Sequence, residues 1–174
     1  IRMIGYGIII LNYLPKEIEL WQPEENCRFA KHTLRMLFDY AEQTKGADVI
    51  HWNNGLWDTS VNLFPDKVAF TSKEEYLANM LRIADILLKF GKKVIFATTT
   101  PVRETYPYNS NRVIDEYNAA LVPLLKEKGI IINDLNSLLR DDLNRYICDD
   151  ELHLSEEGKI LCAKAVAKAI KKAL

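Results

Sequence analysis

The stretch "KKVIFATTTP", residues 92 to 101, decides the fold class of this chain. Its residues are apolar at consecutive positions and rich in β-branched side chains, which is typical of a parallel strand covered on both faces. Pro101 ends the strand because proline has no N–H to donate to a neighbouring strand. The stretch therefore predicts a central strand with a layer of helices on each side.

Helical and strand patterns alternate along the rest of the sequence. Three further segments are predicted as strands: "EIELW" (17 to 21), "ADVIHW" (47 to 52) and "GIIIND" (129 to 134). Apolar residues at helical spacing predict helices over 34–41, 72–88, 113–124 and from Ser155 to the end of the sequence. Strands separated by helices pair in parallel through right-handed crossovers. The sequence thus predicts one domain over residues 1–174, built as a three-layer α/β/α sandwich.

Local signals define three features of these helices. Ser72 followed by Glu75 forms a capping box at the start of the second helix. Ser155 can cap the last helix in the same way. Pro123 lies inside the third helical pattern, and we expect it to kink or shorten that helix.

Composition argues against several classes of protein. Basic and acidic residues number 23 and 24, and no lysine or arginine run forms the basic face of a nucleic-acid-binding protein. No stretch of about 18 apolar residues could span a bilayer. We therefore expect a soluble protein with no nucleic-acid partner and no membrane span. Its location is expected to be the cytoplasm or, if a leader precedes Ile1, another compartment, and the oligomeric state is left open.

No metal or other cofactor is expected. Cys27, Cys148 and Cys162 include no C-x-x-C pair, which argues against a disulfide framework and a structural zinc site. The three histidines lack a short ligand spacing such as H-x-x-x-H. No glycine-rich phosphate loop is present, so nucleotide binding is not expected.

The ends of the predicted strands indicate where a ligand would bind, because ligands of such sheets lie beyond the carboxyl ends of the strands. The loops after Trp21 and Trp52 carry Asn26, Asn53 and Asn54. Their amide groups are hydrogen-bond donors, as an oxyanion hole requires, because a tetrahedral intermediate carries negative charge on one oxygen. The alternative is that these asparagines only make turns.

Asp150 and His153 form an Asp-x-x-His element just before the last helix. The carboxylate could accept a hydrogen bond from one ring nitrogen and leave the other to take a proton from a nucleophile. The spacing favours Asp150 over Asp149 as the orienting acid. The alternative is a solvated acidic loop. Of the other histidines, His51 lies within a strand pattern and is predicted in the core or at the rim, whereas His32 is predicted to be solvated.

Three features together resemble the SGNH or GDSL hydrolases. They are the Asp-x-x-His element at 150–153, "ENC" (25 to 27) after an early strand, and the turn "GLWD" (55 to 58) after the next strand. Those proteins are small α/β enzymes with a flavodoxin-like parallel sheet, mostly esterases, lipases and carbohydrate deacetylases. The resemblance implies a serine esterase in which His153 is the base and Asp150 orients it.

The resemblance also implies an oxyanion hole. The glycine whose N–H donates in the family is matched here by Arg28, and the backbone of that residue could still donate. The family's Gly-x-Asn-Asp motif falls on Gly55 to Asp58, so the usual asparagine is replaced by Trp57. Either the indole N–H of Trp57 or the amide of Asn54 would have to serve as the third donor.

The Gly-Asp-Ser motif that carries the family's nucleophile does not occur in this sequence. In one placement Gly5-Tyr6-Gly7 replaces it, and the protein is a catalytically inactive ligand-binding domain. In the other placement the motif and the strand before it lie upstream of Ile1. The second leaves residues 1–14 for the following helix, about four turns, whereas the first leaves 8–14, about two. We therefore favour a chain that lacks its first strand, which would leave unpaired backbone groups on the neighbouring strands.

Other hydroxyl groups are poor substitutes for that serine, because none follows a sharp glycine turn. They are Ser60, Thr98, Thr99 and Thr100. The substrate expected for the esterase is a small acyl or acetyl ester, including an acetylated carbohydrate. The substrate-binding candidates are Asn26, Asn53 and Trp52, and further aromatic residues that could line the pocket are Trp57, Tyr106 and Tyr108.

Overall fold

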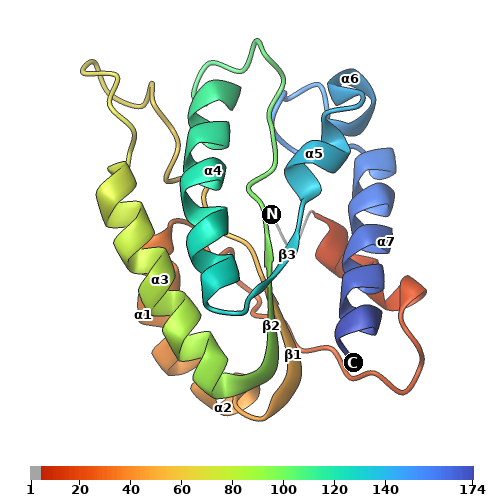
Figure 1. Cartoon of the computed structure of the whole chain (residues 1–174). Coiled ribbons are helices and arrows are strands. Elements are labelled where there is room, and N and C mark those ends of the chain that lie inside the picture. Colours follow the sequence, from red (N-terminus) through yellow and green to blue (C-terminus); the bar gives the residue numbers. More distant parts are fainter. Residues whose placement is uncertain (1–4) are drawn as a thin grey trace.

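A computed structural model describes residues 5–174, and within that range its centre is a parallel sheet of three strands. The strands are β1 (Ala47–Trp52), β2 (Gly91–Ala97) and β3 (Ile131–Asn133), in the order β1-β2-β3. Ile50 of β1 lies opposite Val94, and Ile95 lies opposite Ile131 of β3. The stretch that begins at residue 92 therefore forms the middle strand of these three, as its apolar run predicts (Figure 1).

Helices cover both faces of the sheet (Figure 1). One face packs against α1 (Ala30–Asp39), α3 (Lys73–Phe90) and α4 (Asn111–Glu127). The other face packs against α7 (Glu156–Ala173), α5 (Leu135–Leu139) and the 3-10 turns η1 (Tyr6–Ile8) and η2 (Ile10–Tyr13). Two short helices, α2 (Ala41–Thr44) and α6 (Leu143–Tyr146), lie in the connections. The predicted three-layer α/β/α sandwich is confirmed.

Side chains of β2 point alternately into the two cores. Val94 and Phe96 pack with α3 and α4, whereas Ile95 and Ala97 pack with α5 and α7. None of these four residues is more than 2% exposed. Burial of each of the larger side chains contributes about 2 kcal/mol. The strand therefore anchors both helical layers and fixes the position of its own carboxyl end.

The predicted helix caps are present. The Oγ of Ser72 accepts a hydrogen bond from the N–H of Glu75 at 3.2 Å, and the Oγ of Ser155 accepts one from Gly158 at 3.1 Å. Pro123 was expected to kink or shorten its helix, and the shortening does not occur, because α4 continues to Glu127. Pro123 lies on the exposed side of α4, where water can satisfy the carbonyl group that has lost its N–H partner.

The prediction of a strand over residues 17–21 is also wrong. The structure has no regular element there, although Ile18 and Leu20 pack against the core that contains Val166 of α7. A strand needs a hydrogen-bonded neighbour, and within residues 5–174 the strand β1 pairs with β2 alone. The alternating pattern therefore produced alternating burial without strand pairing.

The segment before residue 15 does not form one continuous helix in the part that the structure describes. The turns η1 and η2 pack against α7, with Ile10 and Leu14 buried in the core that contains Val166. The expected helix over residues 1–14 begins outside the described residues, since these start at residue 5. Within them, no helix is long and apolar enough to cross a membrane.

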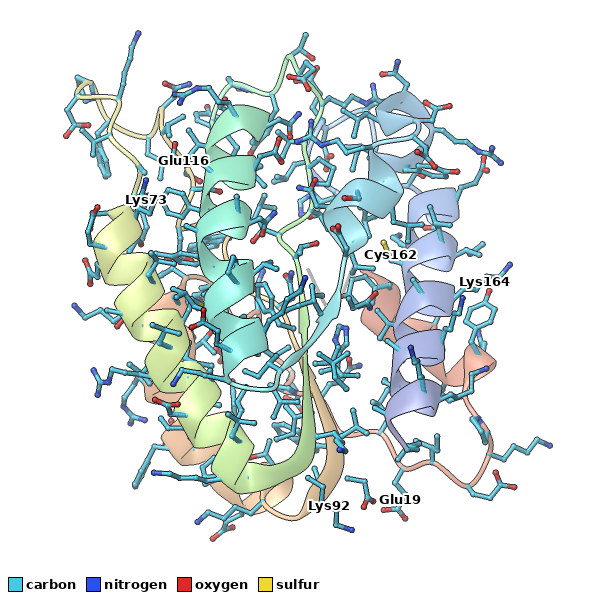
Figure 2. All side chains as sticks on the ribbon, in the orientation of Figure 1. Glu19, Lys73, Lys92, Glu116, Cys162 and Lys164 are labelled. Atoms are coloured by element: carbon cyan, nitrogen blue, oxygen red, sulfur yellow. The ribbon has the colours of Figure 1, made fainter. Side chains whose placement is uncertain are left out.

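Surface ion pairs connect neighbouring helices but contribute little to the fold. Lys73 of α3 and Glu116 of α4 point toward one another, with 2.5 Å between Nζ and Oε1 (Figure 2). An exposed pair of this kind is worth about 0–1 kcal/mol.

Cys162 of α7 is fully buried, and burial raises the pKa of its thiol to about 12. That thiol is part of the core and is not a reactive group.

Candidate active site

The imidazole of His153 is hydrogen-bonded to the carboxylate of Asp150, with 2.7 Å between Nδ1 and Oδ2. The other oxygen, Oδ1, accepts hydrogen bonds from the backbone N–H groups of Leu152 at 3.0 Å and His153 at 2.9 Å. Partial burial raises the pKa of Asp150, but these hydrogen bonds outweigh it and lower the pKa to about 2. Asp150 is therefore a carboxylate that holds one ring nitrogen and leaves Nε2 for other chemistry.

Asp149 does not contact the imidazole, because its side chain is fully exposed and reaches the Arg103 guanidinium at 3.2 Å. The side chain of His153 is 35% exposed, so its ring is accessible from solvent. The structure thus brings together the two residues that the sequence pairs as acid and base. Their catalytic role stays a prediction.

A tight turn holds this pair just before α7. The N–H of Cys148 donates to the carbonyl of His153 at 2.7 Å, and the N–H of Glu151 donates to that of Cys148 at 2.9 Å. Glu151 has a left-handed backbone with φ of 66°. Gly158 in the first turn of α7 packs on Tyr146, whose carbonyl oxygen would lie 2.2 Å from an added Cβ. The glycine therefore allows α7 to start directly against this turn.

The loop "NNGLWD" lies at the carboxyl end of β1 and is tied to the start of α1. Asp58 is fully buried and accepts hydrogen bonds from the N–H of Ala30 at 3.0 and 3.2 Å. An acidic group at this position also suits the positive end of the α1 dipole. Asp58 therefore fixes the first turn of α1 and, with it, the residues just before that helix.

Two of the predicted oxyanion donors lie side by side. The Nδ2 of Asn54 reaches the carbonyl oxygen of Arg28 at 3.4 Å, and Asn54 is only 3% exposed. Arg28 has a φ of 50°, and its backbone N–H donates to the Oδ1 of Asn26 at 2.9 Å. Trp57 is 47% exposed and stacks on Phe29 with ring centroids 6.5 Å apart. The third candidate therefore lies beside the same loop, on its solvent side.

The remaining substrate-binding candidates make contacts within the protein. Asn53 donates from Nδ2 to the carbonyl oxygens of Ala97 at 2.8 Å and Thr98 at 3.2 Å, and so joins the ends of β1 and β2. Trp52 is buried against Phe96, and its indole N–H donates to Asn54 at 3.1 Å. These contacts orient the loop that contains Asn54.

A small apolar cluster places the turn of His153 next to the "GLWD" loop. Leu56, Val102 and Ile114 form its buried part, and Tyr106 and Leu152 pack against them. Leu56 belongs to the "GLWD" loop and Leu152 to the turn of His153, so the loop and the turn pack on the same apolar cluster. The geometry can therefore offer an oriented imidazole on one side of the rim and amide donors on the other.

Three of the four hydroxyl groups considered as substitute nucleophiles are held in structural hydrogen bonds. Thr98 donates to Asp134 at 2.9 Å and Thr99 to the carbonyl of Asn54 at 2.8 Å. Ser60 donates to the carbonyl of Leu56 at 3.3 Å. These three residues and Thr100 are at most 8% exposed. Their contacts are those of residues that stabilise the rim.

The other two histidines occupy different environments. Burial lowers the pKa of His51 to about 4, so the ring is neutral at physiological pH. His51 lies beside Asn133 and the Tyr6 ring, in agreement with a core or rim position. His32 is less solvated than predicted: the residue is half-buried, its ring packs on Phe29 and its Nδ1 is buried. Within residues 5–174 no group of three or more His, Cys, Asp or Glu could hold a metal ion.

Sequence reasoning missed Arg103, which lies between the end of β2 and the turn of His153. Its side chain is 21% exposed, and its Nη2 donates to backbone carbonyl groups near that turn. The available signal was weak. A single arginine shortly after a strand that ends at the rim is compatible with many surface roles.

Solved structures define the class to which this fold belongs. A member of the lipolytic protein G-D-S-L family from Veillonella parvula has a TM-score of 0.77 and 15% identity, covering 97% of this chain and 88% of that one. Axe2, an acetylxylan esterase from Geobacillus stearothermophilus, has a TM-score of 0.72 and 17% identity, covering 95% and 80%. The chain therefore has the fold of the SGNH or GDSL hydrolases.

A sequence comparison agrees with the fold. The chain is 34% identical over 115 residues to the GDSL esterase/lipase WDL1 of Oryza sativa subsp. japonica, which corresponds to 58% of this chain and 44% of that protein. The matched part is thus less than half the length of this curated relative. No family model matches the sequence. The resemblance to SGNH or GDSL hydrolases drawn from "ENC", "GLWD" and the Asp-x-x-His element is confirmed.

Proposed function

We propose that the protein is a serine ester hydrolase that works through an acyl-enzyme. The observation that carries this proposal is the Asp150–His153 pair, with 2.7 Å between its oxygen and nitrogen. A carboxylate that holds Nδ1 keeps the ring in the tautomer whose Nε2 can accept a proton from a serine. The amide donors around Arg28 at the same rim support acyl transfer in particular, because they suit an oxyanion.

The nucleophile in this proposal is a serine in a segment upstream of Ile1, on a strand that would pair with the outer edge of β1. Two observations support this position. Within residues 5–174 the edge of β1 away from β2 has no strand beside it. The buried hydroxyl groups of Ser60 and Thr98 are already hydrogen-bonded.

The reaction would proceed in two steps. The serine oxygen attacks the ester carbonyl while Nε2 of His153 takes the serine proton, and the same proton passes to the leaving alcohol as the ester bond breaks. Water then attacks the acyl-enzyme, His153 takes a proton from the water, and that proton returns to the serine as the acid leaves. Asp150 stabilises the imidazolium formed in each step.

The oxyanion would bind to the N–H of Arg28 and to Nδ2 of Asn54, or to the indole N–H of Trp57. A substrate oxygen would replace the Asn26 side chain, which accepts the Arg28 N–H in this structure at 2.9 Å. The contact of Asn54 with the Arg28 carbonyl favours Asn54 over Trp57 as the third donor. Removal of one such donor usually costs about 100- to 1000-fold in kcat.

The proposed substrate is a small acyl or acetyl ester, with an acetylated carbohydrate as one form of it. The fold neighbour Axe2 is an acetylxylan esterase, which supports a small acyl group. Trp57 and Tyr108 are both 47% exposed at the rim, and Tyr108 packs on Tyr106. Exposed aromatic rings of this kind can cover the apolar face of a sugar or an acyl group.

The decisive experiment treats the full-length gene product with a fluorophosphonate probe and measures its intact mass. We expect an adduct at one site, together with turnover of p-nitrophenyl acetate, and we expect both to be lost in His153→Ala. His32→Ala is the matched control and should keep both. A folded wild-type protein that forms no adduct and hydrolyses no ester would overturn the proposal and support the alternative of an inactive ligand-binding domain with Gly5-Tyr6-Gly7 in place of the motif.

A further inference from the structure

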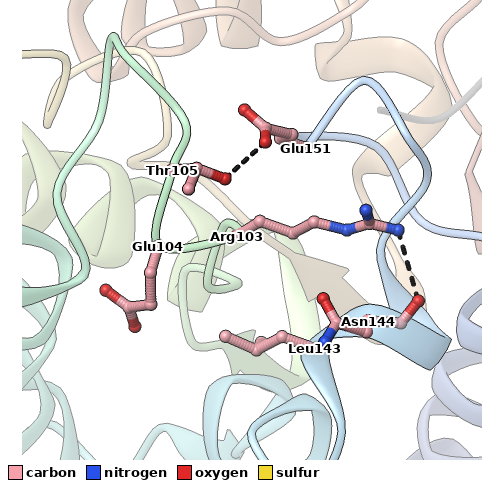
Figure 3. A pocket seen from close by; sticks show the side chains of 6 residues that line it. All are labelled: Arg103, Glu104, Thr105, Leu143, Asn144 and Glu151. Carbon is pink, nitrogen blue, oxygen red and sulfur yellow. Dashed lines mark hydrogen bonds between the residues drawn. The ribbon is translucent and has the colours of Figure 1, made fainter.

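The loop that follows β2 is hydrogen-bonded to the turn that contains Asp150 and His153 and to the segment just before it. The backbone N–H of Arg103 donates to the carbonyl of Glu151 at 3.0 Å. Its guanidinium Nη2 donates to the carbonyl of Ile147 at 2.7 Å. The same Nη2 donates to the carbonyl of Asn144 at 3.2 Å (Figure 3). Arg103 therefore contacts the segment before the turn and the residue directly after Asp150.

The carbonyl groups that Arg103 binds are those that a helix end leaves without partners. Asn144 belongs to α6, and Ile147 is the residue that ends this helix. A guanidinium group suits this position because it carries positive charge and several donors in a fixed plane. The ion pair with Asp149 is a lesser contribution, since the Asp149 side chain is fully exposed.

The contact between the Arg103 N–H and the Glu151 carbonyl is important because of the backbone conformation of Glu151. Its left-handed backbone, with φ of 66°, is unfavourable for a residue other than glycine and has to be held by its surroundings. The Arg103 N–H binds its carbonyl, and the Thr105 hydroxyl donates to its carboxylate (Figure 3). Asp150 precedes Glu151, so the direction of the Asp150 side chain depends on this conformation.

We propose that Arg103 is a positioning residue that keeps the Asp150 carboxylate on Nδ1 of His153 by holding both ends of the turn. The proposal rests on the proposed function for its catalytic meaning, because only a working base needs this alignment. Arg103 itself does not contact the imidazole. Its loss should therefore lower the rate of the chemical steps and leave substrate binding nearly unchanged.

The surroundings of Arg103 also provide a way to test this by chemical rescue. A pocket of about 290 Å³ lies beside its side chain, between Thr105 and Glu151 on one side and Leu143 and Asn144 on the other (Figure 3). In an Arg103→Ala variant this pocket would extend into the space of the missing side chain. A free guanidinium ion could then reach the same carbonyl groups.

The kinetic experiment compares the full-length wild type with Arg103→Ala, Arg103→Lys and the control Arg145→Ala. Arg145 pairs with Glu157 on the surface, so its loss should change the rate less than about twofold. We expect kcat to fall about 10- to 100-fold in Arg103→Ala, with KM changed less than about threefold, and less in Arg103→Lys. Low concentrations of guanidinium should raise kcat of Arg103→Ala saturably and leave Arg145→Ala unchanged.

A second measurement does not depend on esterase activity. The proton between His153 and Asp150 is observed by NMR in the wild type, in Arg103→Ala and in Thr105→Val, which removes only the contact with Glu151. We expect the signal to broaden or disappear in Arg103→Ala, to weaken in Thr105→Val and to return with guanidinium. If the wild type lacks esterase activity, the proposed function fails, and this signal alone decides the role of Arg103.

The inference would be overturned by an Arg103→Ala variant that is folded and keeps both the wild-type kcat and the proton signal. It would equally be overturned if only KM changed, or if guanidinium had no effect on rate or signal. If Arg103→Ala does not fold, Arg103→Lys decides, because lysine keeps the positive charge but lacks the planar fork of donors. An unchanged kcat and an unchanged proton signal in that folded variant would then count against the proposal.

Discussion

Asp58 accepts the backbone N–H of Ala30 with both carboxylate oxygens, at 3.0 and 3.2 Å, in a fully buried site. This contact joins the loop after β1 to the first turn of α1, and the residues that precede this turn include Arg28. The acid of the "GLWD" turn thus holds one side of the rim, while the turn of Asp150 forms the other. Both sides depend on a carboxylate, but the two carboxylates have opposite pKa shifts.

Asp58 should make the stability of the protein fall as the pH rises from about 4 to about 6. Burial raises its pKa from 3.8 to about 6, and hydrogen bonds from Thr71 and Ala30 oppose this only in part. The folded protein therefore binds more protons than the unfolded chain between these two values, and the free energy of unfolding falls as pH rises through them. The contribution is complete below about pH 4, is lost above about pH 6, and amounts to about 3 kcal/mol.

Urea unfolding of the wild type and Asp58→Asn between pH 4 and 8 checks this prediction. The amide cannot ionise, so the stability of the wild type relative to the variant should decrease by up to about 3 kcal/mol across this range. Asp149→Asn is the control, because Asp149 is fully exposed. A stability difference between the wild type and Asp58→Asn that does not change with pH, or that increases with pH, contradicts the assignment.

Asp150 and Asp149 should differ sharply in their effect on ester hydrolysis. Only Asp150 contacts Nδ1 of His153 and accepts the two backbone N–H groups of the turn. Asp150→Asn should lower kcat by about 100-fold or more, because the amide no longer fixes the tautomer that Nε2 needs. Steady-state kinetics with p-nitrophenyl acetate measure this, and Asp149→Asn should stay within about twofold of the wild type. Equal losses in both variants would show that the orienting acid has been misassigned.

The third oxyanion donor can be identified by comparing Asn54→Ala with Trp57→Phe. Asn54 is buried and touches the Arg28 carbonyl, whereas the indole of Trp57 is half-exposed and stacked on Phe29. We expect Asn54→Ala to lose about 100-fold in kcat and Trp57→Phe less than about threefold. Thermal unfolding is measured in parallel, since Asn54 also accepts the Trp52 indole N–H. The reverse order of losses in folded variants would assign the donor to Trp57.

Sequence and structure agree where the signals are local. The strand over 47–52, the middle strand from residue 92 and the caps at Ser72 and Ser155 follow from neighbouring residues alone. The segment 17–21 has an equally clear pattern, but whether it becomes a strand depends on a partner elsewhere. Contacts between distant loops, such as that of Arg103 with Ile147, leave no periodic signal in the sequence.

The site shows the same division between local and distant contacts. The spacing of Asp150 and His153 places them in one turn, so their contact could be expected from the sequence. The contact between Asn54 and Arg28 could not be expected, because it depends on how the loop after β1 packs against the start of α1. The packing of His32 on Phe29 likewise depends on three-dimensional neighbours. The charged residues around His32 in the sequence favoured a solvated ring and gave no signal of this contact.

Gly55 should tolerate a side chain poorly. Its φ of 135° is unfavourable for other residues, and an added Cβ would lie 2.1 Å from Oγ1 of Thr99. That hydroxyl donates to the carbonyl of Asn54, so it cannot move without breaking a buried hydrogen bond. Gly55→Ala should therefore reduce the free energy of unfolding by about 3 kcal/mol or more.

Gly129 provides the matched control for this substitution. It also has a positive φ, 79°, but no atom lies within 4 Å of an added Cβ. Gly129→Ala should cost only the backbone penalty, about 1–2 kcal/mol. Denaturant unfolding of both variants separates the two contributions, because the excess loss in Gly55→Ala measures the contact with Thr99. Equal losses in the two variants would mean that the loop can move away from β2, and the rim would then be less rigid than these contacts indicate.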